Sequence, residues 1–439
     1  MHAIRDAAEE AWNRSALETT ARHAWRQLKV FEECAPDTWF YSGMANVVVR
    51  RTPMGLVVID PGAFNNAQDK QAAIRERFSL NDPAHRVHTI IYTHGHADHC
   101  FGAELYAAEA AAHDWTAPRV VGHEAVARRF QRYQATNGFN AIINLRQFRG
   151  GQGRAYWPME YRAPDLTYRD ELSLDIGGVT VELRHARGET DDASWVFFPD
   201  TRVLCTGDLF VWVTPNCGNP QKVQRYAKDW VAALRTMQSR EAEVLLPGHG
   251  TPIFGAARVR QALGDTATYL ESIHDQTVAL MNEGLPLDTI VQRVQPPADL
   301  LDRPYLQPIY DEPEFIVRNI WRLYGGWYDG VPSHLKPAPE AEQAAVIAEL
   351  AGGARNVADR ALRAIASGDM RLASHLADWA HFAAPDDASI RDIRRQVYEA
   401  RQSEAGSTMA IGLFRSAAVE MGAEISGSTL RASEETRSD

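Results

Sequence analysis

The chain has 439 residues, and its 46 Lys and Arg against 57 Asp and Glu give a formal net charge of −11 with histidine counted as neutral. Hydrophobic residues make up 45% and charged residues 23% of the chain, which excludes a mostly disordered protein. The acidic balance argues against a nucleic-acid-binding protein, because such proteins usually carry a basic surplus, and the length favours two or three domains.

The sequence shows no pattern typical of a secretion signal or of a membrane span. Its N-terminal segment mixes charges throughout and has no apolar h-region. No stretch approaches the roughly 18 uncharged apolar residues of a membrane span. The 4 cysteines are too few and too scattered for a disulfide framework. We therefore expect a cytoplasmic protein without a membrane span.

The predicted elements fall into four regions. Residues 1–25 have apolar side chains at roughly helical spacing and predict a helical arm. Residues 26–262 predict an α/β domain, with strands at 45–50, 55–60, 87–94, 179–185, 194–198, 203–207 and 244–247 and helices at 66–78, 101–112 and 229–239. Residues 263–422 predict an all-α region, with helices at 315–324, 340–350, 356–367, 370–382 and 390–404, and a predicted helix at 259–282 leads into it. Residues 423–439 are polar and predict a flexible tail.

One segment between a predicted strand and a predicted helix concentrates metal-binding side chains. His94 and His96 stand at the strand end, where an irregular turn can aim both imidazoles at one point. Asp98 and His99 follow at the opening of the helix. Imidazole and carboxylate ligands suit zinc and similar transition ions. The spacing therefore predicts a metal site.

This His-x-His-x-Asp-His run resembles the signature of the metallo-β-lactamase superfamily. Further motifs of that superfamily follow in the expected order: Asp60-Pro61-Gly62 at a strand end, Glu189 in a Gly-ligand-Thr turn, Asp208 in a Gly-Asp strand end and His249 in Pro-Gly-His-Gly. The resemblance implies the αββα sandwich of that superfamily and two metal ions, with zinc favoured and iron or manganese as alternatives. By the same resemblance, His94, His96 and Glu189 would hold one ion, Asp98, His99 and His249 the other, and Asp208 would bridge them.

Most members of this superfamily have histidine at the position of Glu189. In having glutamate there, the chain resembles the alkylsulfatases of the superfamily. Three carboxylates (Glu189, Asp98 and Asp208) against the four positive charges of two divalent ions leave a charge of about +1, one unit less than with histidine at position 189. We therefore expect Glu189 to make an activated hydroxide somewhat more basic.

Gly326-Trp327-Tyr328-Asp329-Gly330 and the later helices are also similar to the alkylsulfatases. This resemblance covers residues from about 40 to 422. It implies a homodimer formed by the helical region. We expect a member of the family without the sterol-carrier-like domain that the longer enzymes have.

The predicted function is a dinuclear metal-dependent hydrolase that cleaves a small anionic ester, an alkyl sulfate first of all, with a metal-activated water or hydroxide. Asp98 and His99 are the candidate catalytic residues. Asn216, Asn219, Lys222 and Arg225 are the candidates for gripping the anionic head group, although the arginine of the alkylsulfatases has no counterpart in its matching place. A thioester, a lactone, a phosphoester or a β-lactam remain alternative substrates, because the fold hosts all of them. A non-catalytic scaffold is the remote alternative.

Overall fold

The computed structural model describes residues 3–13, 27–153 and 155–419. The contacts between residues divide the chain into two compact units. One unit comprises Met1–Ala135 and Pro158–Gly326, and the other comprises Thr136–Trp157 and Trp327–Asp439. The first contains two β-sheets with their covering helices, and the described residues of the second are almost entirely helical. The domain boundaries expected from the sequence stay predictions.

Seven strands form the first sheet in simple chain order: β1 (Phe31–Ala35), β2 (Thr38–Tyr41), β3 (Val47–Thr52), β4 (Gly55–Ile59), β5 (Val87–Ile91), β6 (Arg119–His123) and β7 (Leu166–Tyr168). The strands β1 to β4 pair antiparallel through short turns, whereas β4 to β7 pair parallel. A parallel pair needs a crossover connection. The helices α2 (Ala67–Arg77) and α4 (Ala103–Ala112) lie in two of these connections.

Six strands form the second sheet: β8 (Glu171–Ile176), β9 (Val179–His185), β10 (Ser194–Phe198), β11 (Val203–Val211), β12 (Val244–His249) and β13 (Ile253–Phe254). A two-residue turn of Gly177 and Gly178, both with positive φ, joins β8 to β9. The neighbours β11 and β12 are parallel, and α7 (Ala227–Gln238) lies in the connection between them. The carboxyl ends of β11 and β12 therefore lie at the same edge of the sheet.

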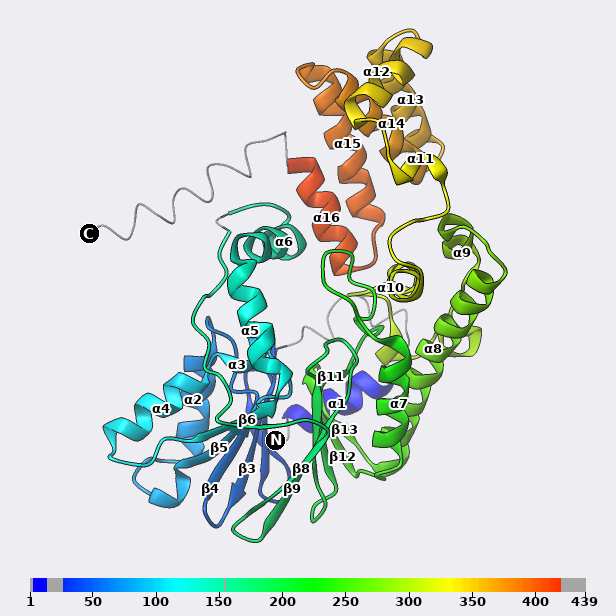
Figure 1. The fold of residues 1–439 in the computed structure, drawn as a ribbon. Helices are drawn as coiled ribbons and strands as arrows, with labels where there is room; N and C mark the ends of the chain where they lie inside the picture. Colours follow the sequence, from blue (N-terminus) through cyan, green and yellow to red (C-terminus); the bar gives the residue numbers. More distant parts are fainter. Residues whose placement is uncertain (1–2, 14–26, 154, 420–439) are drawn as a thin grey trace, which may run out of the picture. The chain divides into compact units, whose positions relative to one another are not determined.

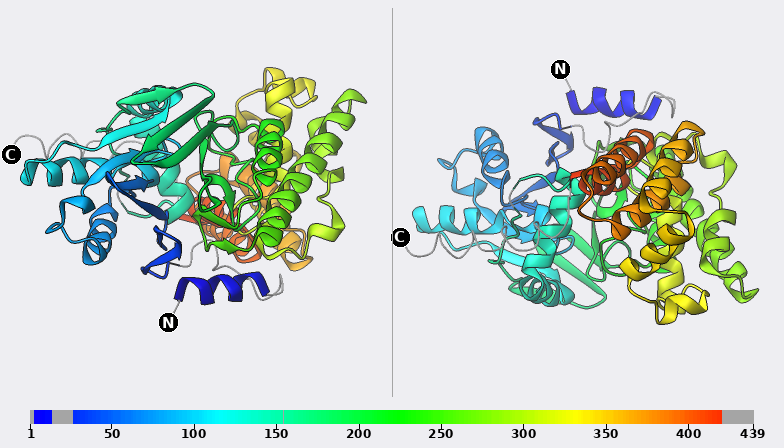
Figure 2. Two further views of the ribbon diagram at one scale, coloured as in Figure 1. Left: turned by 90° about the horizontal axis from the view of Figure 1, so that it is seen from below. Right: turned by 90° about the horizontal axis from the view of Figure 1, so that it is seen from above.

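The two sheets face each other and are covered by helices on both outer sides (Figure 1). Between the sheets lies a core to which Phe40 and Val57 contribute from the first sheet and Val196 and Leu246 from the second. The helices α2, α4 and α5 (Ala125–Ala135) pack outside the first sheet. The helices α7, α8 (Ala256–Asn282), α9 (Leu287–Arg293) and α10 (Pro313–Gly325) pack outside the second (Figure 2). The expected αββα sandwich is confirmed.

The predicted N-terminal arm forms a helix, α1 (Ala3–Asn13), that packs against the sandwich. The Glu32 carboxylate of β1 accepts hydrogen bonds from the backbone N–H groups of Ala3 and Ile4, at 3.0 and 2.9 Å. These two donors belong to the first turn, where a helix cannot pair them itself. The rest of the predicted arm, residues 14–25, lies outside the described residues.

The helical unit contains α6 (Asn137–Arg149), α11 (Pro332–Leu335), α12 (Glu340–Leu350), α13 (Ala354–Ala366), α14 (Met370–Ala383), α15 (Ala388–Glu404) and α16 (Thr408–Val419). Local sequence signals explain two of their starts, because the side chains of Asp369 and Asp387 cap the first turns of α14 and α15. The helices α6 and α16 approach closely at Gly412, where a Cβ atom would lie 2.0 Å from the Gln147 carbonyl oxygen. The expected all-helical region is confirmed, and the predicted tail at 423–439 lies outside the described residues.

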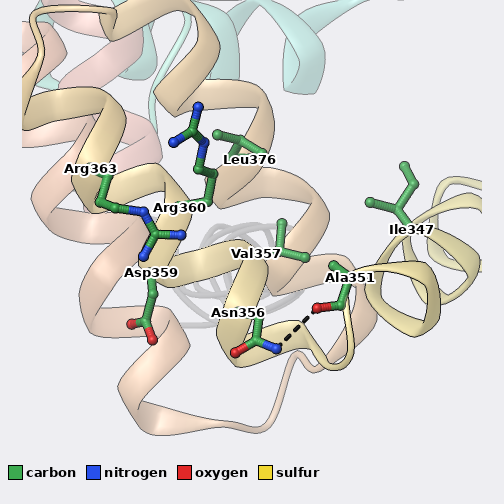
Figure 3. A pocket seen from close by; sticks show the side chains of 8 residues that line it. All are labelled: Ile347, Ala351, Asn356, Val357, Asp359, Arg360, Arg363 and Leu376. Atoms are coloured by element: carbon green, nitrogen blue, oxygen red, sulfur yellow. Dashed lines mark hydrogen bonds between the residues drawn. The ribbon is translucent and has the colours of Figure 1, made fainter.

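A pocket of about 450 Å³ lies within this helical unit (Figure 3). Ile347, Val357 and Leu376 contribute apolar side chains to its lining, and Arg360 and Arg363 contribute guanidinium groups. None of the predicted site residues lines it. Among the described residues, no helix combines the length and the apolar composition that crossing a bilayer requires.

Candidate metal centre

The loop after β5 carries the first four candidate ligands. The strand ends at Ile91, earlier than the predicted 87–94, and the chain leaves the sheet so that His94 and His96 lie in a loop. His94 Nε2 is 2.9 Å from His96 Nδ1. The short helix α3 (Ala97–Cys100) then places Asp98 and His99 in its single turn. The local sequence thus brings both imidazoles of the His-x-His pair to one point, as expected.

Asp60, at the end of β4, holds this loop in place. Its carboxylate accepts hydrogen bonds from the backbone N–H and the hydroxyl of Thr93, at 2.8 and 2.7 Å. The Asp60 Oδ2 atom also lies 3.0 Å from His99 Nδ1. A carboxylate behind an imidazole fixes the ring orientation and leaves the opposite nitrogen, Nε2, for a metal ion. The Asp-Pro-Gly motif therefore acts on the site through His99.

Asp192 holds the same loop from another side. Its Oδ2 atom accepts a hydrogen bond of 2.9 Å from the Gly95 N–H, between His94 and His96. Arg129 of α5 pairs with Asp192 at 2.9 Å, and both side chains are almost fully buried. The sequence reasoning did not find Arg129, because a single arginine on a predicted helix has no signal that marks it as part of a distant site.

Asp208 is the residue around which the other candidates gather. Its Oδ2 atom lies 3.6 Å from His94 Nε2 and 3.5 Å from His249 Nε2, and its Oδ1 atom lies 3.5 Å from His99 Nε2. Asp208 lies on β11 and His249 ends β12, so the parallel pairing of these strands brings both to one sheet edge. The structure thus brings together residues from three separate motifs.

Three groups of side chains in the described part of the chain are close enough to hold a metal ion. The first is His94, His96 and Asp208, the second is Asp98, His99 and His249, and the third, Asp60, His94 and His99, shares its two imidazoles with the others; within each group the ligand atoms lie within 4.8 Å of one another. Glu189 lies beside the first group, with its Oε1 atom 3.9 Å from His96 Nδ1. The seven residues expected to form the metal set are therefore gathered in one place, and their assignment as ligands stays a prediction.

The chemistry of this cluster fits a positively charged ion. In the part of the chain that the structure describes, His99 Nε2 and Asp208 Oδ1 are buried without a hydrogen-bond partner, which is costly unless an ion satisfies them. Burial by itself lowers the pKa of His249, yet the carboxylates of Asp208 and Asp98 raise it to about 10. Burial and the neighbouring Asp208 raise the pKa of Glu189 to about 8. The carboxylates that raise the pKa of His249 are negative charges that divalent ions would balance.

Backbone carbonyl groups complete the surroundings of His249. The Met44 carbonyl oxygen is hydrogen-bonded to His249 Nδ1. The neighbouring Asn46 donates from Nδ2 to the carbonyl oxygens of Pro247 and Gly250, at 3.0 and 2.9 Å. This turn thereby fixes the Pro-Gly-His-Gly segment on both sides. No sequence signal marks Met44, since any residue type supplies a carbonyl oxygen.

The four candidates for gripping the head group all lie in the segment that precedes α7. Asn216 donates from Nδ2 to Glu189 Oε1, and Arg225 Nη2 lies 3.6 Å from the same oxygen. Asn219 is buried and its Oδ1 atom accepts from the Gln221 N–H at 3.1 Å. Burial, together with Arg225, lowers the pKa of Lys222 to about 7. The structure thus brings Asn216 and Arg225 to the metal centre through Glu189, and the substrate-binding role of all four stays a prediction.

Comparisons with known sequences divide the chain into two matched regions. Residues 41–249 match the metallo-beta-lactamase superfamily, and residues 287–424 match the alkyl sulfatase dimerisation family. A linear primary-alkylsulfatase from Pseudomonas sp. is 29% identical over 367 residues, which cover 79% of this chain and 68% of the relative. An (R)-specific secondary-alkylsulfatase from Pseudomonas sp. is 25% identical over 442 residues, which cover 93% of this chain and 66% of the relative.

The solved structures agree on the fold. The stereoselective inverting sec-alkylsulfatase Pisa1 from Pseudomonas sp. matches with a TM-score of 0.80 at 24% sequence identity. The match covers 95% of this chain and 70% of that chain. The α/β sandwich and the helical region that follows it therefore occur together in a known structure.

Proposed function

This chain is a metallo-β-lactamase-fold homologue of the alkylsulfatases, and we propose that it is a dinuclear metal-dependent hydrolase that cleaves alkyl sulfate esters. The observation that carries the proposal is the arrangement around Asp208, whose carboxylate lies within 3.6 Å of three imidazoles from both candidate metal groups. A carboxylate shared in this way is able to bridge two adjacent ions.

We assign His94, His96 and Glu189 to one zinc ion and Asp98, His99 and His249 to the other, with Asp208 between them. When bound, two such ions lower the pKa of a water molecule for attack and stabilise charge on the oxygen atoms of the transition state. The role of the chain is to keep the imidazoles oriented, which Asp60 does for His99 and the Met44 carbonyl for His249. Iron or manganese ions are the alternatives, because carboxylates supply three of the seven ligands.

The region beside Glu189 supports an anionic ester as the substrate. Arg225 Nε is buried without a hydrogen-bond partner among the described residues, so this guanidinium keeps an N–H donor for a further ligand such as an anion. Burial and the neighbouring Arg225 lower the pKa of Lys222, and the carboxylates of Glu189 and Asp98 act against them and favour its charged form. We assign the sulfate head group to these cationic residues with Asn219. The names of the curated relatives favour an alkyl sulfate over the other esters.

We further propose that the helical region joins two chains into a homodimer. The match of residues 287–424 to the alkyl sulfatase dimerisation family supports this assembly. Exposed apolar side chains on α12, Val346 and Leu350, fit an interface between identical chains. The four buried free cysteines favour a reducing compartment such as the cytoplasm.

The experiment combines metal analysis with a substrate panel. Elemental analysis of the purified protein should find two zinc ions per chain. Turnover should be fastest with linear or secondary alkyl sulfates, compared with an acyl thioester, a lactone, a phosphodiester and a β-lactam, and it should stop after chelation. Equal turnover by the metal-free protein would refute the mechanism. Preferential turnover of another member of the panel would refute the substrate.

A further inference from the structure

The segment between β11 and α7 rests on the stretch of chain that leads into α10. The Thr214 N–H donates to the Gln307 carbonyl oxygen at 3.0 Å, and the Gly218 N–H donates to the Asp311 carboxylate at 2.5 Å. A Cβ atom at Gly218 would lie 2.2 Å from the backbone nitrogen of Ile316, so only glycine permits this approach. Residues 307–316, which lie in the region that matches the alkyl sulfatase dimerisation family, therefore set the position of this segment.

Arg225, near the end of this segment, is fixed by α10. The Arg225 N–H donates to Asn319 Oδ1 at 3.2 Å, and Asn319 Nδ2 donates back to the Arg225 carbonyl oxygen at 3.0 Å. One amide side chain thus satisfies both backbone polar groups of Arg225. Arg225 is only 2% exposed and Asn319 only 5%. The buried backbone of Arg225 therefore has a single defined position.

The guanidinium group of Arg225 faces the carboxylate of Glu189. Its Nη2 atom lies 3.6 Å from Glu189 Oε1, and Asn216 donates a hydrogen bond to the same oxygen. All three side chains are buried. A buried cation beside a buried carboxylate interacts strongly, because little water screens the pair.

The charge of this pair accounts for the departure from histidine at position 189. Two divalent ions with the carboxylates of Asp98, Asp208 and Glu189 would carry a net charge of +1, and the guanidinium of Arg225 beside Glu189 would raise it to +2. A histidine at position 189 without a neighbouring arginine gives the same +2. The pair of Glu189 and Arg225 is therefore equal in net charge to one neutral imidazole.

We propose that Glu189 and Arg225 act as one electrostatic unit, held in place by Asn319, and that this unit replaces a neutral imidazole in the metal centre. The inference rests on the proposed function, because it takes Glu189 as a metal ligand. It assigns to Arg225 a positioning and charge-balancing role that does not depend on substrate. The region that contains Asn319 thereby contributes to the metal centre as well as to assembly.

A double-mutant cycle on zinc affinity tests the unit, with affinity measured by competition with a chromophoric chelator in the absence of substrate. The proteins are the full chain and its Glu189→His, Arg225→Met and Glu189→His/Arg225→Met variants. Glu189→His leaves a buried guanidinium without its carboxylate beside two cations, so it should weaken zinc binding. Adding Arg225→Met should restore affinity, and its effect should be at least about tenfold more favourable in the Glu189→His background than in the native one. Equal effects in both backgrounds would overturn the proposal.

Further variants separate the possible reasons for a change. Asn319→Leu alters neither charge but frees the backbone of Arg225, and it should lower zinc affinity by about 10-fold or more. Arg318→Gln on the same helix removes an exposed ion pair with Glu314 and should leave zinc affinity unchanged. If Arg225→Met changes only KM for alkyl sulfate and leaves zinc affinity intact in both backgrounds, Arg225 is solely a substrate residue and the unit is refuted. Unchanged zinc affinity in Glu189→Gln would instead remove Glu189 from the metal set, and with it the proposed ligand assignment.

Discussion

The two halves of the proposed metal centre are held in opposite ways. On the half formed by Asp98, His99 and His249, oxygen acceptors lie behind the imidazoles: the Asp60 carboxylate behind His99 and the Met44 carbonyl behind His249. On the half formed by His94, His96 and Glu189, a guanidinium and an amide donor lie behind the carboxylate. Each of these imidazoles therefore has a hydrogen-bond acceptor behind it, whereas the carboxylate has hydrogen-bond donors behind it.

This difference indicates that the charge of each candidate ligand is balanced by a neighbouring group of its own. An acceptor behind an imidazole makes the ring a stronger ligand, because it raises the basicity of the ring and fixes the tautomer. A cation behind a carboxylate limits the negative charge that the carboxylate adds to the centre. The two halves can therefore use different ligand types and still present similar charges to two similar ions.

The largest expected effect comes from the residue that both halves share. Asp208→Ala should lose both ions and lower kcat/KM by at least ~10³-fold, because metal activation of water depends on the pair. Asp208→Glu keeps the carboxylate and should retain both ions. Elemental analysis and turnover of the two variants measure this. Two ions in Asp208→Ala would show that the halves do not depend on a shared ligand.

Next come changes confined to one half. His96→Ala should remove the ion on the Glu189 side, and Asp98→Ala the ion on the His249 side, and each should lower activity by at least ~10³-fold. Titration with zinc should find one tight site in each variant. The loss of both ions from either single variant would mean that the two halves fold as one indivisible site.

A smaller loss should follow when a partner of a ligand is removed rather than the ligand. Asp60→Ala should lower zinc affinity by about 10–100-fold through the freed ring of His99. Arg51→Gln removes the exposed ion pair with Asp37 and serves as the control, with no change in affinity expected. Chelator competition checks both. Native affinity in Asp60→Ala would show that packing alone orients His99.

Loss of a head-group contact should affect substrate rather than metal. Lys222→Met should raise KM for an alkyl sulfate by about 10-fold, the effect of one charge-assisted hydrogen bond, and leave the zinc content unchanged. Steady-state kinetics with elemental analysis distinguishes the two quantities. An unchanged KM would exclude Lys222 from the head-group site.

The smallest effect concerns the chemistry of the activated water. Glu189→His should keep the fold and still bind metal, and a more positive centre should make that water more acidic. The acidic limb of the pH–rate profile should therefore move to lower pH, by about one unit or less. The profile of the native chain, recorded with the same alkyl sulfate, is the reference. An identical profile would show that the charge at position 189 does not reach the water.

The sequence predicted those features that depend on near neighbours in the chain. The run from His94 to His99 places four candidate ligands within six residues, in a loop and the short helix α3 that follows it. The helical spacing of residues 340–404 predicted α12 to α15 closely. Short edge strands such as β1 and β13 were missed, because two to five residues carry too little pattern. The strand predicted at 203–207 extends to Val211, because pairing with β12 continues past Gly207.

The sequence by itself therefore determined which residue types meet at the metal centre, since each motif places its ligand at the end of a local element. Only the tertiary structure decided what stands behind those ligands. The three pairs in contact are far apart in the chain: Asp60 and His99, Met44 and His249, and Arg225 and Glu189. The contacts of Asp60 and His249 depend on where the strands β4 and β12 end. Any residue type supplies a carbonyl oxygen, so no sequence pattern marks the one that contacts His249. A single arginine is usually an exposed charge, and only the folded structure shows that Arg225 is buried. Long-range packing, which fixes those positions, leaves no periodic trace in the sequence.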